Sequence, residues 1–211
     1  MVTAPSNARR GVLARRIRML VAATIAYNVV EATVALAEGT RVSSTALVAF
    51  GLDSVIEVSS AAAVAWQFSA TDPETRERRA LRFIAFSFFA LAAYVTVHAG
   101  LSLLGVAEAQ HSPVGIGLAA LSLIVMPLLS WAQRRTGREL GSRSAVADSK
   151  QTLLCTYLSA ALLAGLVANA VLGWSWADPV AALVIAAIAV REGVDAWRGD
   201  PCCANLKEEC P

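Results

Sequence analysis

Six long apolar segments, separated by short stretches that carry most of the charge, constrain this chain more than any other feature. They span roughly residues 17–37, 44–69, 80–104, 113–132, 150–173 and 176–196. A helix needs about 20 predominantly apolar residues to cross the hydrocarbon core of a bilayer, and each segment comes close to that length. The sequence therefore predicts an all-α membrane protein with six transmembrane helices.

The overall composition agrees with this prediction. Hydrophobic residues make up 56% of the 211 residues and charged residues only 16%, which is typical of an integral membrane protein. The net charge of +2 does not indicate a nucleic-acid partner, because basic loops alone give a membrane protein such an excess. The first apolar segment is too long for a signal peptide, so we expect it to be retained.

The distribution of arginine predicts the orientation in the membrane. Arginines cluster before the first segment, between the second and third, and between the fourth and fifth, whereas the other loops hold few or none. Short basic loops stay on the cytoplasmic side, so both termini are expected there. Three parts follow: a basic N-terminus over 1–16, a transmembrane transport domain over 17–198, and a cysteine-containing cytoplasmic tail over 199–211.

The stretch "GLDSVIEVSS" places Asp53 and Glu57 inside the second segment. Residues four apart share one face of a helix, so the two carboxylates project side by side. A charge at mid-membrane costs on the order of 2.5–3.5 kcal/mol, so protonation, a cation or a water-filled cavity must compensate. Alternatively, the two acids accept hydrogen bonds from polar side chains of neighbouring helices.

The fifth segment offers Gln151 and Cys155 at the same spacing. A cysteine thiolate is a soft metal ligand, and the two pairs together can present three oxygens and one sulfur. Four ligands are the number that a tetrahedral divalent metal takes. Alternatively, Gln151 is only a polar residue at a helix end, and Cys155 is a small hydrophobic residue that packs between helices.

These residues resemble motifs of the cation diffusion facilitator family of metal transporters. In "STALVAFGLDSVIEVSS" Asp53 matches the family pattern and Glu57 stands for its second aspartate. In "AVADSKQTLLCTYLS" Asp148 matches, while Gln151 and Cys155 replace a histidine and an aspartate. The "ADPVAALVIA" start of the sixth segment is also similar. The family's cytoplasmic metal-binding domain is expected to be missing.

The resemblance implies a secondary transporter that exports a divalent metal from the cytoplasm, zinc first or cadmium, by proton antiport. We expect no resident cofactor and no enzymatic activity, since we find no nucleophile-base set and no phosphate-binding loop. A homodimer is expected by analogy. Two other functions stay open: a membrane-embedded metal sensor or scaffold without transport, and a proton-coupled exporter of organic cations.

Further candidate residues lie outside the two pairs. Asn28 and Glu31 share one face of the first segment. Glu31 is either an accessory ligand or proton carrier, or it makes a polar contact with the second or fifth helix, and Asn28 is a second accessory candidate. Asp148 is a third accessory candidate. The tail "GDPCCANLKEECP" is expected to capture cytoplasmic metal or to hold incidental thiols, and its cysteines are Cys202, Cys203 and Cys210.

Overall fold

The computed structural model describes residues 7–68, 74–105, 109–140 and 143–198, and within these ranges all regular structure is helical. This confirms the predicted all-α fold with six helices. The tail cysteines lie outside the described residues. In chain order the helices are α1 (Asn7–Arg41), α2 (Thr45–Phe68), α3 (Glu74–Leu103), α4 (Pro113–Leu140), α5 (Arg143–Leu172) and α6 (Ala177–Arg198).

Several helices extend beyond the apolar segments that predict them. Helix α1 begins at Asn7 rather than near residue 17, and α4 continues to Leu140. These extra turns are rich in arginine, alanine, leucine and glutamate, which favour helix in water as well as in lipid. Hydropathy indicates only the part of a helix that lies in hydrocarbon, and the helix extends beyond that part.

Five of the six helices, α1 to α5, are long and apolar enough to cross a membrane. Helix α6 is shorter and has charged residues near both ends, Asp178 in its first turn and Arg191, Glu192 and Asp195 in its last turns. Its buried face is nonetheless made almost wholly of small or apolar residues. It therefore packs inside the same bundle as the other five.

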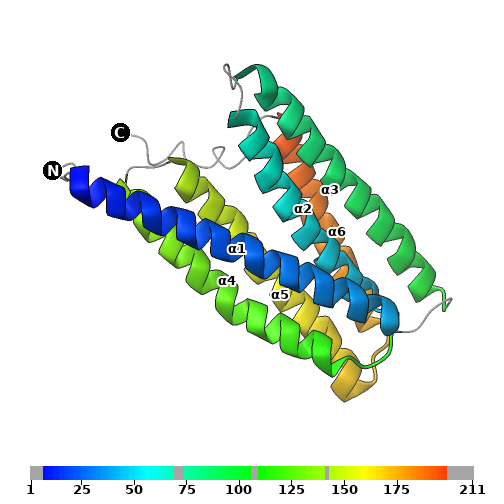
Figure 1. Cartoon of the computed structure of the whole chain (residues 1–211). Coiled ribbons are helices and arrows are strands. Elements are labelled where there is room, and N and C mark those ends of the chain that lie inside the picture. The colour runs from blue at the N-terminus through cyan, green and yellow to red at the C-terminus, as the bar shows by residue number, and fades with distance from the viewer. Residues whose placement is uncertain (1–6, 69–73, 106–108, 141–142, 199–211) are drawn as a thin grey trace, which may run out of the picture.

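The helices form two groups of three. Helix α4 packs along α5 and is also in contact with α1, while α3 packs along α6 and both lie against α2. The groups meet through α1 with α2, through α5 with α6 and, over a smaller contact, through α2 with α5. Figure 1 shows their ribbons close together at one end and diverging towards the end at which α1 begins and α6 ends.

Glycines allow the two groups to approach closely. A Cβ atom on Gly165 of α5 would lie 2.7 Å from the Cβ of Ala181 of α6, and one on Gly51 of α2 would lie 3.0 Å from the Cβ of Ala35 of α1. Real Cβ atoms do not come this near to one another. Small residues at these contacts let helix backbones pack tightly, as they do in membranes.

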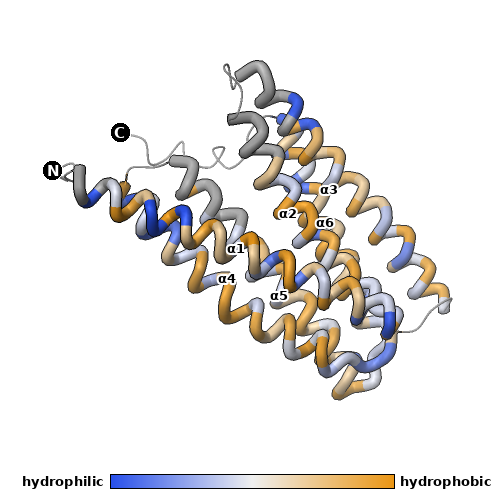
Figure 2. Tube along the Cα trace, viewed as in Figure 1, coloured by the Kyte–Doolittle hydropathy of each residue, from blue (hydrophilic) through white to orange (hydrophobic). Residues whose placement is uncertain are grey.

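Large apolar side chains cover much of the outer surface. Examples from all six helices are exposed: Val30, Val55, Phe86, Ile124, Tyr157 and Val184. Figure 2 shows apolar colour along much of each helix and hydrophilic residues gathered towards several of the ends. An apolar surface this extensive is unusual for a protein surrounded by water, and it suits contact with lipid.

The end where the groups meet carries the loop over 42–44, the described residues 104–105 and 109–112 between α3 and α4, and the loop over 173–176, and we call it the loop end. There Asp178 of α6 accepts hydrogen bonds from the hydroxyl of Ser44 at 2.5 Å and from the backbone N–H of Thr45 at 2.9 Å. The Ser44 oxygen in turn accepts the N–H of Leu47 at 3.1 Å. Asp178 thus helps to cap α2, since free N–H groups at a helix start need acceptors.

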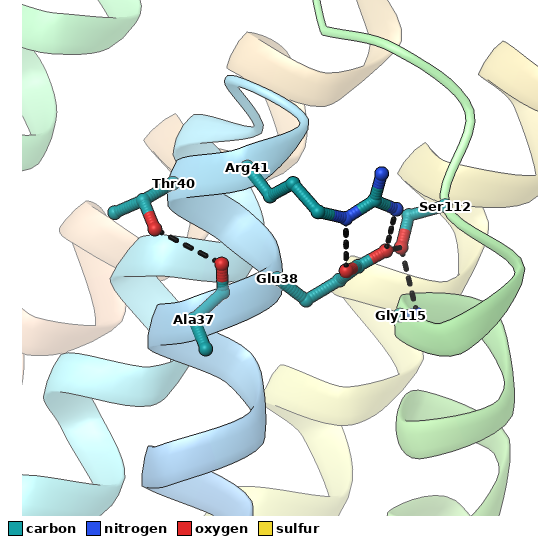
Figure 3. A network of polar contacts seen from close by, with 6 residues as sticks. All are labelled: Ala37, Glu38, Thr40, Arg41, Ser112 and Gly115. Atoms are coloured by element: carbon teal, nitrogen blue, oxygen red, sulfur yellow. Dashed lines mark hydrogen bonds and ion pairs between the residues drawn. The ribbon is translucent and has the colours of Figure 1, made fainter.

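Helix α4 begins in a similar way, as Figure 3 shows. Ser112 accepts the N–H of Gly115 at 2.8 Å and donates its hydroxyl to Glu38 of α1 at 2.6 Å. Arg41 completes the network with two bonds to the same carboxylate, at 2.7 and 2.8 Å. Both α2 and α4 therefore start at a serine that a carboxylate of another helix holds in place.

Candidate metal site

Helix α2 carries Asp53 and Glu57 on one buried face. Both side chains are almost fully buried in the interior of the bundle, as the spacing of four residues predicts. Glu57 points towards α5, because its carboxylate contacts a side chain of that helix. The acid pair therefore lies inside the protein rather than against lipid.

Cys155 of α5 meets this pair from the other group of helices. Its thiol is buried and donates a hydrogen bond to Oε1 of Glu57 over 2.7 Å. The ligand atoms of Asp53, Glu57 and Cys155 all lie within 4.8 Å of one another. Within the described ranges, these three side chains form the group of carboxylate and thiol ligands that are near enough to one another to hold one metal ion. We call it the three-ligand group.

The fourth predicted ligand, Gln151, belongs to α5 one turn before Cys155. Its side chain and that of Asp148 lie outside what the structure describes, and the same holds for Cys202, Cys203 and Cys210. Their roles stay predictions. The backbone of α5 is continuous through residues 148 and 151, so the register that places Gln151 one turn from Cys155 is that of a regular helix.

Asn28 and Glu31 of α1 both reach the interior but have different partners. The amide Nδ2 of Asn28 donates to Oε2 of Glu57 at 2.5 Å. Glu31, which is 0% exposed, accepts the hydroxyl of Ser54 of α2 at 2.8 Å and the hydroxyl of Ser122 of α4. Glu31 therefore makes the polar contacts to neighbouring helices that the sequence left open, and Asn28 touches the three-ligand group.

Sequence reasoning missed a polar stripe on α4. The helix buries Ser122, Ser130 and Gln133 along one face, and the spacing of eight and then three residues, close to two turns and one turn of helix, was the available signal. Besides the bond of Ser122 to Glu31, Ser130 donates to the backbone oxygen of Ser149 at 2.6 Å.

Gln133 links three helices on the same side of the bundle. Its Nε2 donates to the hydroxyl of Thr24 on α1 at 3.2 Å, and its Oε1 accepts the hydroxyl of Thr152 on α5 at 3.0 Å. Since Thr24 is one turn from Asn28 and Thr152 three residues from Cys155, this polar layer lies directly beside the candidate site. The interior of the group formed by α1, α4 and α5 is therefore polar along much of its length.

An all-helical protein with an apolar outer surface and buried carboxylate and thiol side chains that meet between its helices defines a class of integral membrane protein. Residues 80–198, more than half of the chain, match the cation efflux transmembrane domain. The chain therefore belongs to the cation efflux family, whose members transport metal cations, and it is a multi-pass membrane protein. No curated protein matches the chain.

The family match confirms the resemblance that the sequence motifs indicated. It covers α3 to α6 and so includes Cys155, but it does not extend to Asp53 and Glu57 of α2. The case for these two acids therefore depends on their own motif and on their geometry. Their proximity to Cys155, which lies within the matched region, links the two halves of the candidate site.

Proposed function

We propose that this protein is a secondary transporter that exports a divalent metal ion, zinc in the first place, from the cytoplasm. Asp53, Glu57 and Cys155 are its metal ligands. The observation that carries the proposal is the three-ligand group itself, two carboxylates and a thiol within 4.8 Å in the bundle interior. Two buried carboxylates side by side need compensation for their charge, and a divalent cation is one species that supplies it.

The ligand types support zinc or cadmium over harder ions. Carboxylate oxygens accept many divalent metals, whereas a thiolate favours soft and borderline ions such as zinc and cadmium. Zinc takes mixed sulfur and oxygen ligands in tetrahedral sites. A site with one sulfur ligand therefore suits zinc and also accepts cadmium.

Proton antiport follows from the chemistry of the same ligands. Metal binding requires deprotonated ligands and so releases protons. The thiol hydrogen of Cys155 now lies in the bond to Glu57, and a metal ion bound by both atoms must displace it. Protons that enter from outside the cell would then restore the hydrogen bond between Cys155 and Glu57. The metal would thereby be released on the outer side of the membrane.

The two groups of three helices suit alternating access around this site. The candidate ligands come from both groups, Asp53 and Glu57 from one and Cys155 from the other. With the orientation that the arginine clusters predict, the loop end faces away from the cytoplasm and the diverging end faces it. Rocking of one group against the other would expose a midplane site to each side in turn.

Proteoliposomes with an enclosed zinc-sensitive dye test this proposal. Purified full-length protein should produce dye signal that depends on external zinc, and an imposed proton gradient should change its rate. A sensor or scaffold would bind zinc without flux, and an organic-cation exporter would show proton-coupled flux of a cationic dye but none of zinc. Zinc binding without any zinc flux would therefore overturn transport as the function.

A further inference from the structure

The three-ligand group leaves one position of a tetrahedral metal site to be filled. Zinc bound by protein side chains in a closed site takes four ligands. Asp53, Glu57 and Cys155 supply three of them. The inference below rests on the proposed function and concerns the source of the fourth.

Asn28 of α1 is placed for this role by its contact and its burial. It is 3% exposed, and its Nδ2 is 2.5 Å from Oε2 of Glu57. Its other amide atom, Oδ1, is buried and has no hydrogen-bond partner among the described residues. Buried polar atoms without a partner are rare in folded proteins, and an ion missing from the site is one of their physical explanations.

The amide of Asn28 can present oxygen as well as nitrogen to the site. Rotation about the bond between Cβ and Cγ exchanges the two atoms, so the oxygen reaches the place where the nitrogen now touches Glu57. A cation at the site would favour that rotation, because it attracts the amide oxygen and repels the amide hydrogens. Glu31 cannot serve in the same way while two serine hydroxyls occupy both of its oxygens.

We propose that Asn28 supplies the fourth ligand of the metal site through its amide oxygen. The ligands then come from three helices, α1, α2 and α5, in place of the two that the sequence motifs indicate. The two carboxylates and one thiolate already carry more negative charge than a divalent ion carries positive charge. The amide of Asn28 is neutral, so it completes the set of four ligands without adding to that excess. A bound metal would also tie α1 and α5 of one group to α2 of the other.

Zinc affinity of the purified full-length protein, measured by competition with a chromophoric chelator, tests this inference. Asn28→Leu keeps the size of the side chain and removes its oxygen, and Asn28→Asp restores an oxygen at the same branch. Loss of groups outside the coordination shell typically weakens metal binding by about 10–100-fold, so loss of a ligand should raise the dissociation constant at least about tenfold. Asn28→Asp should retain zinc binding.

Asn169→Leu is the matched control. Asn169 is also buried, but it lies on α5 at the loop end and donates to the backbone oxygen of Ala109 at 2.9 Å. Its replacement should leave zinc affinity unchanged. Wild-type affinity in Asn28→Leu would overturn the inference, and so would a loss in Gln151→Ala that Asn28→Leu does not share.

Asp53→Ala separates this inference from the proposed function. If Asp53→Ala loses zinc binding while Asn28→Leu keeps it, only the fourth ligand is misassigned. If the wild type binds no zinc, the proposed function fails as well. Should Asn28→Leu not fold, the cobalt-loaded Asn28→Asp protein decides. Its absorption spectrum should differ from that of the wild type, and an identical spectrum would place Asn28 outside the coordination shell.

Discussion

The thiol of Cys155 on α5 donates its hydrogen to the Glu57 carboxylate on α2 across 2.7 Å. This bond joins the two groups of helices in the interior of the bundle. If both atoms are metal ligands, a bound ion occupies the place of that hydrogen. The same contact then determines both the metal selectivity of the site and the number of protons released when a metal binds.

Substitution of Cys155 should change metal selectivity. Cys155→Asp replaces a soft sulfur by a hard oxygen, so transport should persist with the preference shifted from cadmium towards manganese. Cys155→Ala should weaken the binding of every metal. Flux ratios of cadmium, zinc and manganese, measured side by side in proteoliposomes, check both variants. Unchanged ratios and affinities would mean that Cys155 only packs.

Zinc binding should release protons, and Cys155 should account for part of them. Because the thiol must lose its hydrogen to bind metal, Cys155→Ala should release about one proton fewer per zinc than the wild type. Calorimetric titrations in buffers of different ionisation enthalpy give this number. Ser159→Ala, one turn along α5, is a control that should match the wild type. Equal proton release in Cys155→Ala would contradict the proposed exchange.

The face shared by Asp53 and Glu57 was predictable from the sequence because local spacing decides it. Asp53 and Glu57 share a face through the helical repeat alone, and Cys155 was found from a motif on a second helix. Asn28 lies 29 residues from its partner Glu57. That contact depends on how α1 is rotated against α2, which no pattern within α1 reveals.

The loop end was beyond sequence reasoning for a similar reason. Asp178 was identified only as the start of the sixth span, yet it caps α2 across 134 residues of chain. The sequence contains both the serine that begins α2 and the aspartate. Nothing in either segment says that they meet, because the pairing follows from the packing of α6 beside α2.

Glu31 should be a structural residue of the interior rather than a metal ligand. Glu31→Ala removes the acceptor of the Ser122 hydroxyl and one of two acceptors of the Ser54 hydroxyl, which also bonds the backbone oxygen of Phe50 at 3.2 Å. A buried group that loses its partner costs about 1–3 kcal/mol. The unfolding temperature in detergent should therefore fall clearly, while folded protein keeps its zinc affinity. Glu31→Gln should recover part of the stability. Lost zinc affinity at unchanged unfolding temperature would instead make Glu31 a ligand.

Asp178 should stabilise the loop end through the start of α2. Asp178→Ala removes acceptors for Ser44 and for the N–H of Thr45, and loss of a helix cap costs about 0.5–2 kcal/mol. Its effect on the unfolding temperature should overlap with that of Ser44→Ala, because both remove the same bond. A double variant whose effect is the full sum of the two single ones would show that the residues act independently.

Zinc flux through the Asp53→Ala protein shows whether transported metal passes through the three-ligand group. Equal amounts of wild-type and variant protein are reconstituted into proteoliposomes with an enclosed zinc-sensitive dye, and Asp195→Ala serves as a control, since Asp195 of α6 lies outside the three-ligand group. We expect zinc flux to disappear in Asp53→Ala and to persist in Asp195→Ala. Wild-type flux in a correctly inserted Asp53→Ala protein would contradict the proposed site.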